Sequence, residues 1–313
     1  MKFCQSVVNN ATKVLIQKKM KHTHTILIGE NASGKSAVIK EYIIEMLDRG
    51  EEIYYIDSVN RYFDVSKVST PYSQIQNSSN VDVIKTRVEK EYFNLKDTFS
   101  LFGTLNDQIE LIYLEYEKEL QEILKSFLGV SFELKGIKEK EVRFAPESEG
   151  TLSSGIQALV RMFLELLYLN DMVENHVMVV IDEIDEFLSP ANAGKILNFL
   201  IARFSKMKFL VSTHSSELVK NSKHCNIMIL YHEDIEVIDS DDFCDEYDVS
   251  ALFEKVFPYV QSPKDNEEDK LRILLNNRIS GVWTENNDIE LSRLEGKNLT
   301  NSQKLLLQQI KEW

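Results

Sequence analysis

The stretch TILIGENASGKS at residues 25–36 decides the fold of this chain. Its apolar first part, residues 25–28, predicts a strand that runs directly into the pattern GxxxxGK[ST]. Apolar residues at helical spacing follow, and then IYYID at residues 53–57 predicts a second strand. Strand, glycine-rich loop, helix and strand in this order form a βαβ unit, whose two strands are parallel. The sequence therefore predicts an α/β fold with a mainly parallel central sheet.

The loop between the first strand and the helix has the residue types of a phosphate-binding P-loop, which predicts a P-loop NTPase. Glycines let backbone N–H groups turn toward phosphates, the Lys35 ammonium reaches the β- and γ-phosphates, and the Ser36 hydroxyl ligates magnesium. The predicted nucleotide-binding residues are Gly29, Glu30, Asn31, Ala32, Ser33, Gly34, Lys35 and Ser36. ATP and Mg²⁺ are the expected cofactors.

A further apolar strand ends in two adjacent acids, as in a Walker B motif. Residues 177–181 form the continuous apolar run of a strand that is buried on both faces, and Asp182 and Glu183 follow it. Successive strand residues point to opposite sides, so one acid can address the magnesium shell while the other addresses a water beside the γ-phosphate. We expect Asp182 to be a metal residue and Glu183 the general base. A solvated acidic strand end is the alternative interpretation.

Two shorter segments complete the set of motifs. TLSSGIQ at residues 151–157 precedes an apolar helix, whose free N–H groups and dipole favour anions at its N-terminus. The residues of this N-terminus are Ser153, Ser154 and Gly155. An ordinary serine N-cap gives the same pattern. His214 follows a further apolar strand, and its place after the Walker B segment favours a catalytic γ-phosphate contact over a structural role.

Together the four motifs resemble those of ABC-class ATPase heads, a group that includes transporter motors, SMC and RecF-like proteins, and the OLD-like ATPases of bacterial phage defence. The resemblance covers residues 25–231. LSSGIQ is similar to the LSGGQ signature, and IDEIDEFLSP looks most like the Walker B segment of OLD-like and compact defence-associated heads. The resemblance implies that the signature of one subunit closes over ATP on another. The implied assembly is a homodimer or higher oligomer that acts on a separate effector protein.

The sequence also departs from the pattern of this family. A predicted helix near residues 7–16 stands in place of the usual N-terminal strands, so the adenine-contacting residue is not assigned. Ser189 occupies the position at which transporters have the D-loop aspartate. A Q-loop glutamine is not evident, and the candidates are Asn60, Gln74 and Gln76.

Changes in composition predict two domains. Residues 83–128 form a predicted helical insertion that acts as a lid or arm, and residues 130–146 suit a hairpin that leads to the signature. Between residues 233 and 248 there are nine acidic residues and no lysine or arginine. We therefore expect an ABC-type ATPase domain over residues 1–232 and a small α-rich accessory module over residues 233–313.

Charge and cysteine content limit the remaining possibilities. A formal net charge of -14 opposes nonspecific attraction to nucleic acid, although a local basic groove stays open. No run of eighteen apolar residues occurs, so we expect a cytoplasmic protein with no membrane association. The cysteines Cys4, Cys225 and Cys244 are far apart and lack CxxC spacing, which argues against a disulfide framework or a cysteine-based zinc site.

The preferred function is an ATP-gated dimeric switch. ATP binding would close two heads, hydrolysis directed by Glu183 would reopen them, and the insertion and C-terminal module would transmit the state to an effector of anti-phage defence. One alternative is a RecF-like, DNA-stimulated repair ATPase, which the acidic balance disfavours. A second is a noncatalytic scaffold that binds ATP structurally. A transporter motor fits least, because the usual coupling aromatic residue and helical subdomain are not recognisable.

Overall fold

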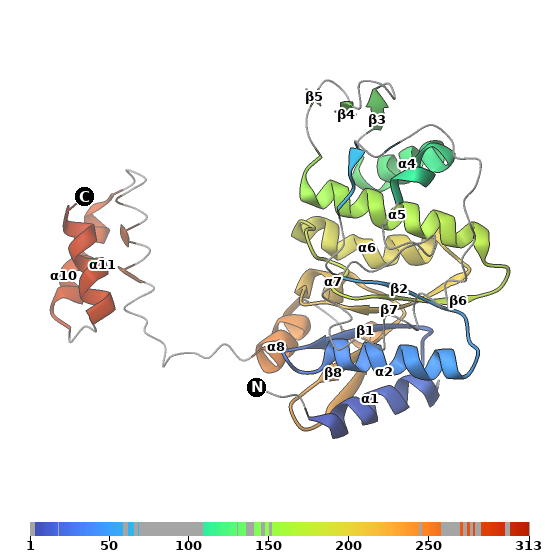
Figure 1. Cartoon of the computed structure of the whole chain (residues 1–313). Coiled ribbons are helices and arrows are strands. Elements are labelled where there is room, and N and C mark those ends of the chain that lie inside the picture. Colours follow the sequence, from blue (N-terminus) through green and yellow to red (C-terminus); the bar gives the residue numbers. More distant parts are fainter. Residues whose placement is uncertain are drawn as a thin grey trace. The chain divides into compact units, whose positions relative to one another are not determined.

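The computed structural model describes most of the chain and divides it into two compact units, Met1–Phe257 and Pro258–Trp313 (Figure 1). The described residues are 4–17, 19–58, 62–65, 68, 109–129, 131–135, 141–144, 148–149, 152–243, 246–257, 270–271, 274–275, 278, 283–297 and 301–312. Residues 83–108 of the predicted insertion, the Q-loop candidates Asn60, Gln74 and Gln76, and also Thr151 and Cys244 lie outside this set.

The first unit is built on a six-stranded sheet with the strand order β2-β6-β7-β1-β8-β9. Its strands are β1 (His24–Gly29), β2 (Ile53–Ile56), β6 (Val177–Ile181), β7 (Met207–Ser212), β8 (Cys225–Leu230) and β9 (Ile235–Asp239). All neighbouring strands pair in parallel except β9, which runs antiparallel to β8. The sheet confirms the predicted α/β class with a mainly parallel sheet.

Helices cover both faces of this sheet, which explains why its strands are apolar runs rather than alternating patterns. In Figure 1, α1 and α2 lie below the sheet, and α6, α5 and α4 are stacked above it. These helices are α1 (Gln5–Gln17), α2 (Lys35–Asp48), α4 (Tyr113–Leu128), α5 (Ser154–Met172) and α6 (Pro190–Arg203). A helix therefore does precede β1, as the sequence predicted, and its apolar stripe packs on α2.

The described part of the predicted insertion packs into the core. The 3₁₀ turn η2 (Ile109–Ile112) leads into α4, which contacts α5. The apolar stripe of α4 is buried along this contact and consists of Tyr116, Leu120, Ile123, Leu124 and Phe127. Because this stripe has a partner within the same unit, residues 109–128 form a fixed layer of the unit. Over these residues the predicted lid or arm is a helix packed on α5.

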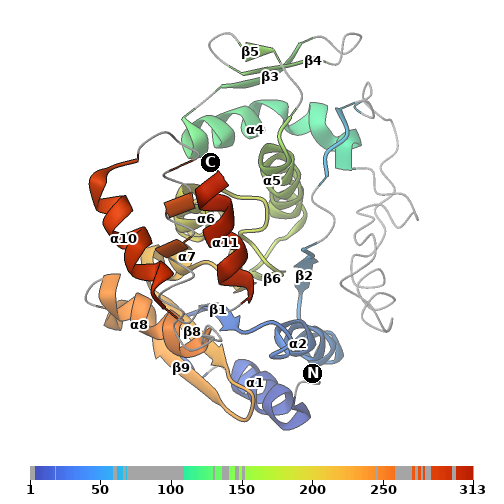
Figure 2. The same cartoon turned by 90° about the vertical axis from the view of Figure 1, so that its left-hand side faces the viewer.

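A small antiparallel sheet connects this layer to the signature helix. Its strands are β3 (Phe132–Lys135), β4 (Glu141–Phe144) and β5 (Ser148–Glu149). The pairing of β3 with β4 confirms the predicted hairpin. Figure 2 shows this sheet beside α4, at the end of the unit that is remote from α1 and α2.

The acidic segment after residue 232 belongs to the first unit. β9 pairs with β8, the 3₁₀ turn η3 (Ser240–Asp242) follows it, and α8 (Glu246–Val256) packs on α7 (Ser216–Asn221). Backbone pairing thus carries the first unit past the predicted boundary, up to Phe257. The second unit contains α10 (Glu285–Glu295), α11 (Asn301–Glu312) and an apolar cluster of its own. Among the helices described, none is long and apolar enough to cross a membrane.

Candidate nucleotide-binding site

The P-loop lies between β1 and α2, at the carboxyl edge of the parallel strands. Ala32 and Gly34 both adopt left-handed backbone conformations, with φ of 63° and 102°. Left-handed residues in such a turn aim successive N–H groups toward one concave side, where anions bind. Gly29 leaves no room for a side chain, because a Cβ there would lie 2.6 Å from Ser33 Oγ and 2.8 Å from the carbonyl oxygen of Leu230.

Lys35, the first residue of α2, is held inside this loop. The side chain is buried, and its Nζ donates hydrogen bonds to the carbonyl oxygens of Gly29 at 2.8 Å and Glu30 at 3.1 Å. Burial lowers the pKa of Lys35, and the nearby carboxylates of Asp182 and Glu183 act in the opposite direction. These interactions place one cation at the P-loop beside the two Walker B acids.

Ser36 and Asp182 meet directly. Ser36 Oγ donates to Asp182 Oδ2 at 3.2 Å, although the two residues come from the start of α2 and the end of β6. Asp182 is 2% exposed, and its other oxygen accepts a hydrogen bond from Ser212 Oγ. A serine hydroxyl and a carboxylate are oxygen ligands of the kind that Mg²⁺ prefers. The structure therefore brings together the two predicted metal residues, and they fit a magnesium ion.

Glu183 directly follows Asp182 and is half-buried. Its φ of 48° is uncommon for a residue with a side chain, and its backbone N–H donates to Ser212 Oγ at 2.7 Å. Burial raises the pKa of Glu183, and the negative charges of Asp182 and Glu186 raise it further. A carboxylate with a raised pKa accepts a proton more readily, which suits a general base.

Two residues at this edge of the sheet were not among the predicted site residues. Ser212, at the end of β7, bridges the Asp182 carboxylate and the Glu183 backbone. Asp57 is buried directly after β2, and the register of Ile56 with Ile181 places Asp57 beside Asp182. The signal for both was present in the sequence, because polar residues at the ends of parallel strands collect at one edge.

The predicted signature residues start helix α5. Ser153 is its N-cap, and its Oγ accepts a hydrogen bond from the N–H of Ile156 at 3.4 Å. A Cβ on Gly155 would lie 2.5 Å from the carbonyl oxygen of Phe187, so the helix start packs tightly on the segment after β6. Ser153 and Ser154 are exposed. The capping interpretation thus holds for Ser153, while both serines remain accessible to another molecule.

Ser189, at the D-loop position, is also a helix cap. It precedes Pro190, the first residue of α6, and its Oγ accepts a hydrogen bond from the N–H of Asn192 at 3.4 Å. Ser189 therefore serves as the N-cap of this helix, with proline at the first helical position.

His214 follows β7, at the same edge of the sheet as the P-loop. Its ring lies against Phe257, with 5.6 Å between the ring centroids. Although the residue as a whole is exposed, burial of part of the ring lowers the pKa of His214 to about 4, and the positive charge of Lys35 contributes to this shift. The imidazole is therefore neutral at pH 7. In that form it has one nitrogen that donates and one that accepts.

This low pKa predicts an effect on stability in acid. The unfolded chain, with a histidine pKa near 6.5, binds the proton before the folded chain does, so stability is lost as the pH falls from 6.5 toward 4. The free energy of unfolding should therefore fall less with acid in His214→Asn than in the wild type, by on the order of 1 kcal/mol after a discount for the exposure of the residue. Urea unfolding at pH 7 and pH 4.5 measures the difference. The exposed His176, changed to Asn, is the control, and equal acid sensitivity of wild type and His214→Asn contradicts the prediction.

Comparison with known proteins gives likenesses in structure only. Neither a protein-family model nor a curated protein sequence matches the chain. An SMC head domain from Thermotoga maritima matches at a TM-score of 0.31 and 20% identity, over 42% of this chain and 51% of that one. MJ1267, an ATP-binding cassette of an ABC transporter, matches at 0.40 and 16%, over 76% and 88%. CbiO1 from Clostridium perfringens, part of an ABC transporter complex, matches at 0.37 and 14%, over 77% and 87%.

The chain spans about half the length of the two SMC head structures that lead these matches, 51% and 46%. The class of this protein is therefore defined by its own fold and by the geometry of its candidate site. It is an α/β protein with a P-loop at the carboxyl edge of a mainly parallel sheet. At that edge a lysine and a serine from the start of α2 meet the paired acids that follow β6.

Proposed function

We propose that this chain binds Mg²⁺–ATP and hydrolyses it. The observation that carries the proposal is the contact between Ser36 and Asp182, whose chain neighbours Lys35 and Glu183 interact electrostatically. In the proposed mechanism Lys35 binds the β- and γ-phosphates, and Ser36 and Asp182 hold the magnesium ion, directly or through water. Glu183 accepts a proton from the attacking water, and neutral His214 donates a hydrogen bond to the γ-phosphate.

We further propose that hydrolysis requires two copies of the chain. Within the chain, Ser153 accepts a hydrogen bond from the N–H of Ile156 at the start of α5. Gly155 packs closely on the segment after β6. The exposed hydroxyl of Ser154 and the adjacent helix N-terminus are available to the ATP of a second copy, as the sequence resemblance implies. ATP would then join two heads, and its hydrolysis would release them.

Ser154→Arg tests the two-copy mechanism. The large side chain at the helix N-terminus should block closure, so steady-state turnover should fall at least about 100-fold while ATP binding to the single chain stays unchanged. A malachite-green phosphate assay and fluorescent-ATP titration measure the two quantities. Ser292→Arg is the matched control, because it makes the same change at an exposed helical serine of the second unit. Wild-type turnover in Ser154→Arg would contradict a role of Ser154 at the ATP of a second copy, and the residue would then only form part of the start of α5.

The biological role follows from the sequence resemblance alone. We propose that the gated dimer regulates a separate effector protein of a bacterial anti-phage defence system. A toxin or nuclease encoded next to this chain, and retained by the chain in pull-down only with ATP, would support the proposal. DNA-stimulated turnover without such a partner would favour the RecF-like alternative instead.

A further inference from the structure

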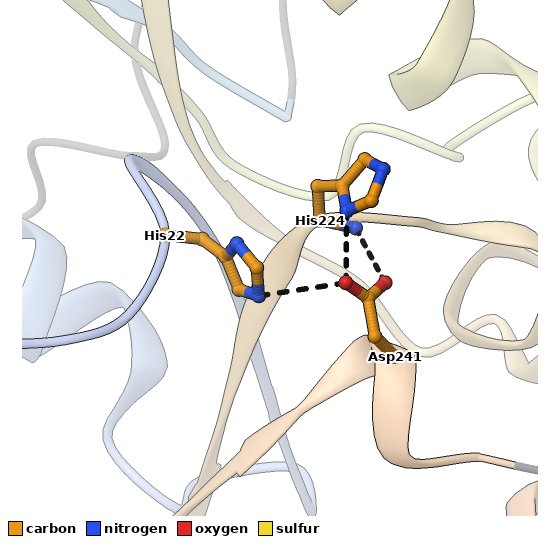
Figure 3. A group of neighbouring side chains, drawn as sticks. All are labelled: His22, His224 and Asp241. Atoms are coloured by element: carbon orange, nitrogen blue, oxygen red, sulfur yellow. Dashed lines mark hydrogen bonds and ion pairs between the residues drawn. The ribbon is translucent and has the colours of Figure 1, made fainter.

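A cluster of side chains of metal-ligand type lies at the opposite edge of the six-stranded sheet from the P-loop. His22 precedes the N-terminal end of β1, and His224 precedes that of the neighbouring strand β8. Asp241 lies in η3, directly after β9, which runs antiparallel to β8 and so returns to the same edge. Figure 3 shows both imidazole rings close to the Asp241 carboxylate.

The three side chains are close enough to share one ion. His224 Nδ1 lies 2.8 Å from Asp241 Oδ2, and His22 Nε2 lies 3.8 Å from the same oxygen. One ligand atom from each of the three residues lies within 4.8 Å of the other two. In a tetrahedral zinc site with bonds of about 2.1 Å, ligand atoms are about 3.4 Å apart. Side-chain adjustments of about 1 Å therefore suffice to bind such an ion.

Asp239 adds a second carboxylate to the cluster. Its Oδ1 lies 2.8 Å from His22 Nε2, and its Oδ2 is paired with the Lys21 ammonium, whose side chain is largely exposed. Both rings contact the Asp241 carboxylate, whereas Asp239 contacts the His22 ring. Asp239 stands next to His22 as a further ligand or as the group that orients this ring.

We propose that His22, His224 and Asp241 bind a transition-metal dication of the Zn²⁺ type. Two imidazole nitrogens and a carboxylate suit zinc, whereas magnesium and calcium prefer oxygen ligands throughout. The His224 side chain is 80% exposed, which leaves a path for entry and one coordination position open to water. The ion would join the loop before β1, the start of β8 and the turn after β9. It would thus cross-link these three segments at a site remote from the P-loop.

The test uses the full chain without an affinity tag or nucleotide, after removal of metals with a chelator. Zinc binding is followed by calorimetry, and Co²⁺ is used as a spectroscopic probe of the coordination geometry. His224→Asn is the best variant, because His224 has a φ of 55° and asparagine is among the residues that tolerate this conformation. His22→Gln is the second variant. The controls are His176→Asn, at an exposed histidine elsewhere, and Asp182→Asn, which alters the proposed magnesium site.

We expect the wild type and both controls to bind one Zn²⁺ and to show a rise of a few degrees in Tm with zinc. Affinity should fall at least about tenfold in His224→Asn and His22→Gln, since changes even in the outer shell of a metal site cost about 10–100-fold. Absence of stoichiometric zinc binding by the wild type overturns the proposal. So does unchanged affinity in folded His224→Asn. Because the assay contains no ATP, its outcome is independent of the proposed ATPase activity.

Discussion

Glu183→Gln should reduce ATP turnover by about 10²–10⁴-fold while ATP binding persists, because the amide keeps the size of the carboxylate but loses its basicity. The raised pKa of Glu183 and its position next to Asp182 are the structural reasons to assign it the proton. If ATP joins two heads, blocked hydrolysis also prevents their separation, so the closed dimer should accumulate. A phosphate assay measures turnover, and light scattering with and without Mg²⁺–ATP measures mass.

The controls for this experiment come from the same segment. Glu186→Gln removes an equal charge from an exposed residue and should leave turnover within a few fold of wild type. Asp182→Asn should give less closed dimer than Glu183→Gln, since it weakens the coordination of magnesium and therefore the affinity for ATP. Normal hydrolysis by Glu183→Gln would move the general base elsewhere, with Asp185 or Glu186 next. Tight ATP binding without a change in mass would refute the gated dimer but not the ATPase.

Lys35→Ala should weaken Mg²⁺–ATP binding at least about 30-fold, because loss of one partner of a buried charge pair costs about 2–5 kcal/mol. Lys35 is the cation that the P-loop itself holds, through the carbonyl oxygens of Gly29 and Glu30. Fluorescent-ATP titration measures the affinity. Lys35→Met fills the buried space without the charge and should show the same loss, which separates charge from packing. Lys13→Ala, at an exposed lysine of α1, is the control. Unchanged affinity in both Lys35 variants refutes the P-loop assignment.

Local sequence was enough to predict the P-loop region. Strand, loop and helix at residues 24–48 follow from apolar periodicity and from glycine placement, and both act between near neighbours in the chain. The meeting of Ser36 with Asp182 was also predictable, because parallel strands expose their carboxyl ends at one edge. The roles of these residues in binding and catalysis remain predictions.

Other features depended on packing that the sequence pattern does not express. The apolar stripe of α4 indicated a helix, but its partner α5 was not identifiable from the stripe alone. The acidic segment after residue 232 resembled the start of a new module by composition. Composition does not report strand pairing, and β9 joins the main sheet through backbone hydrogen bonds to β8. The contacts of Ser212 likewise depend on strand order, since its partners Asp182 and Glu183 directly follow the neighbouring strand β6.

The sequence by itself determined that this chain is an α/β protein with a phosphate-type loop and a strand that ends in paired acids, because these features are encoded by residues adjacent in the chain. Only the tertiary structure decided which distant residues share a site. His22 and His224 carry no recognisable metal-binding spacing, yet the pairing of β1 with β8 and of β8 with β9 places them around Asp241. Strand order and register set such neighbours, and both depend on how whole strands pair, which no spacing between two histidines expresses.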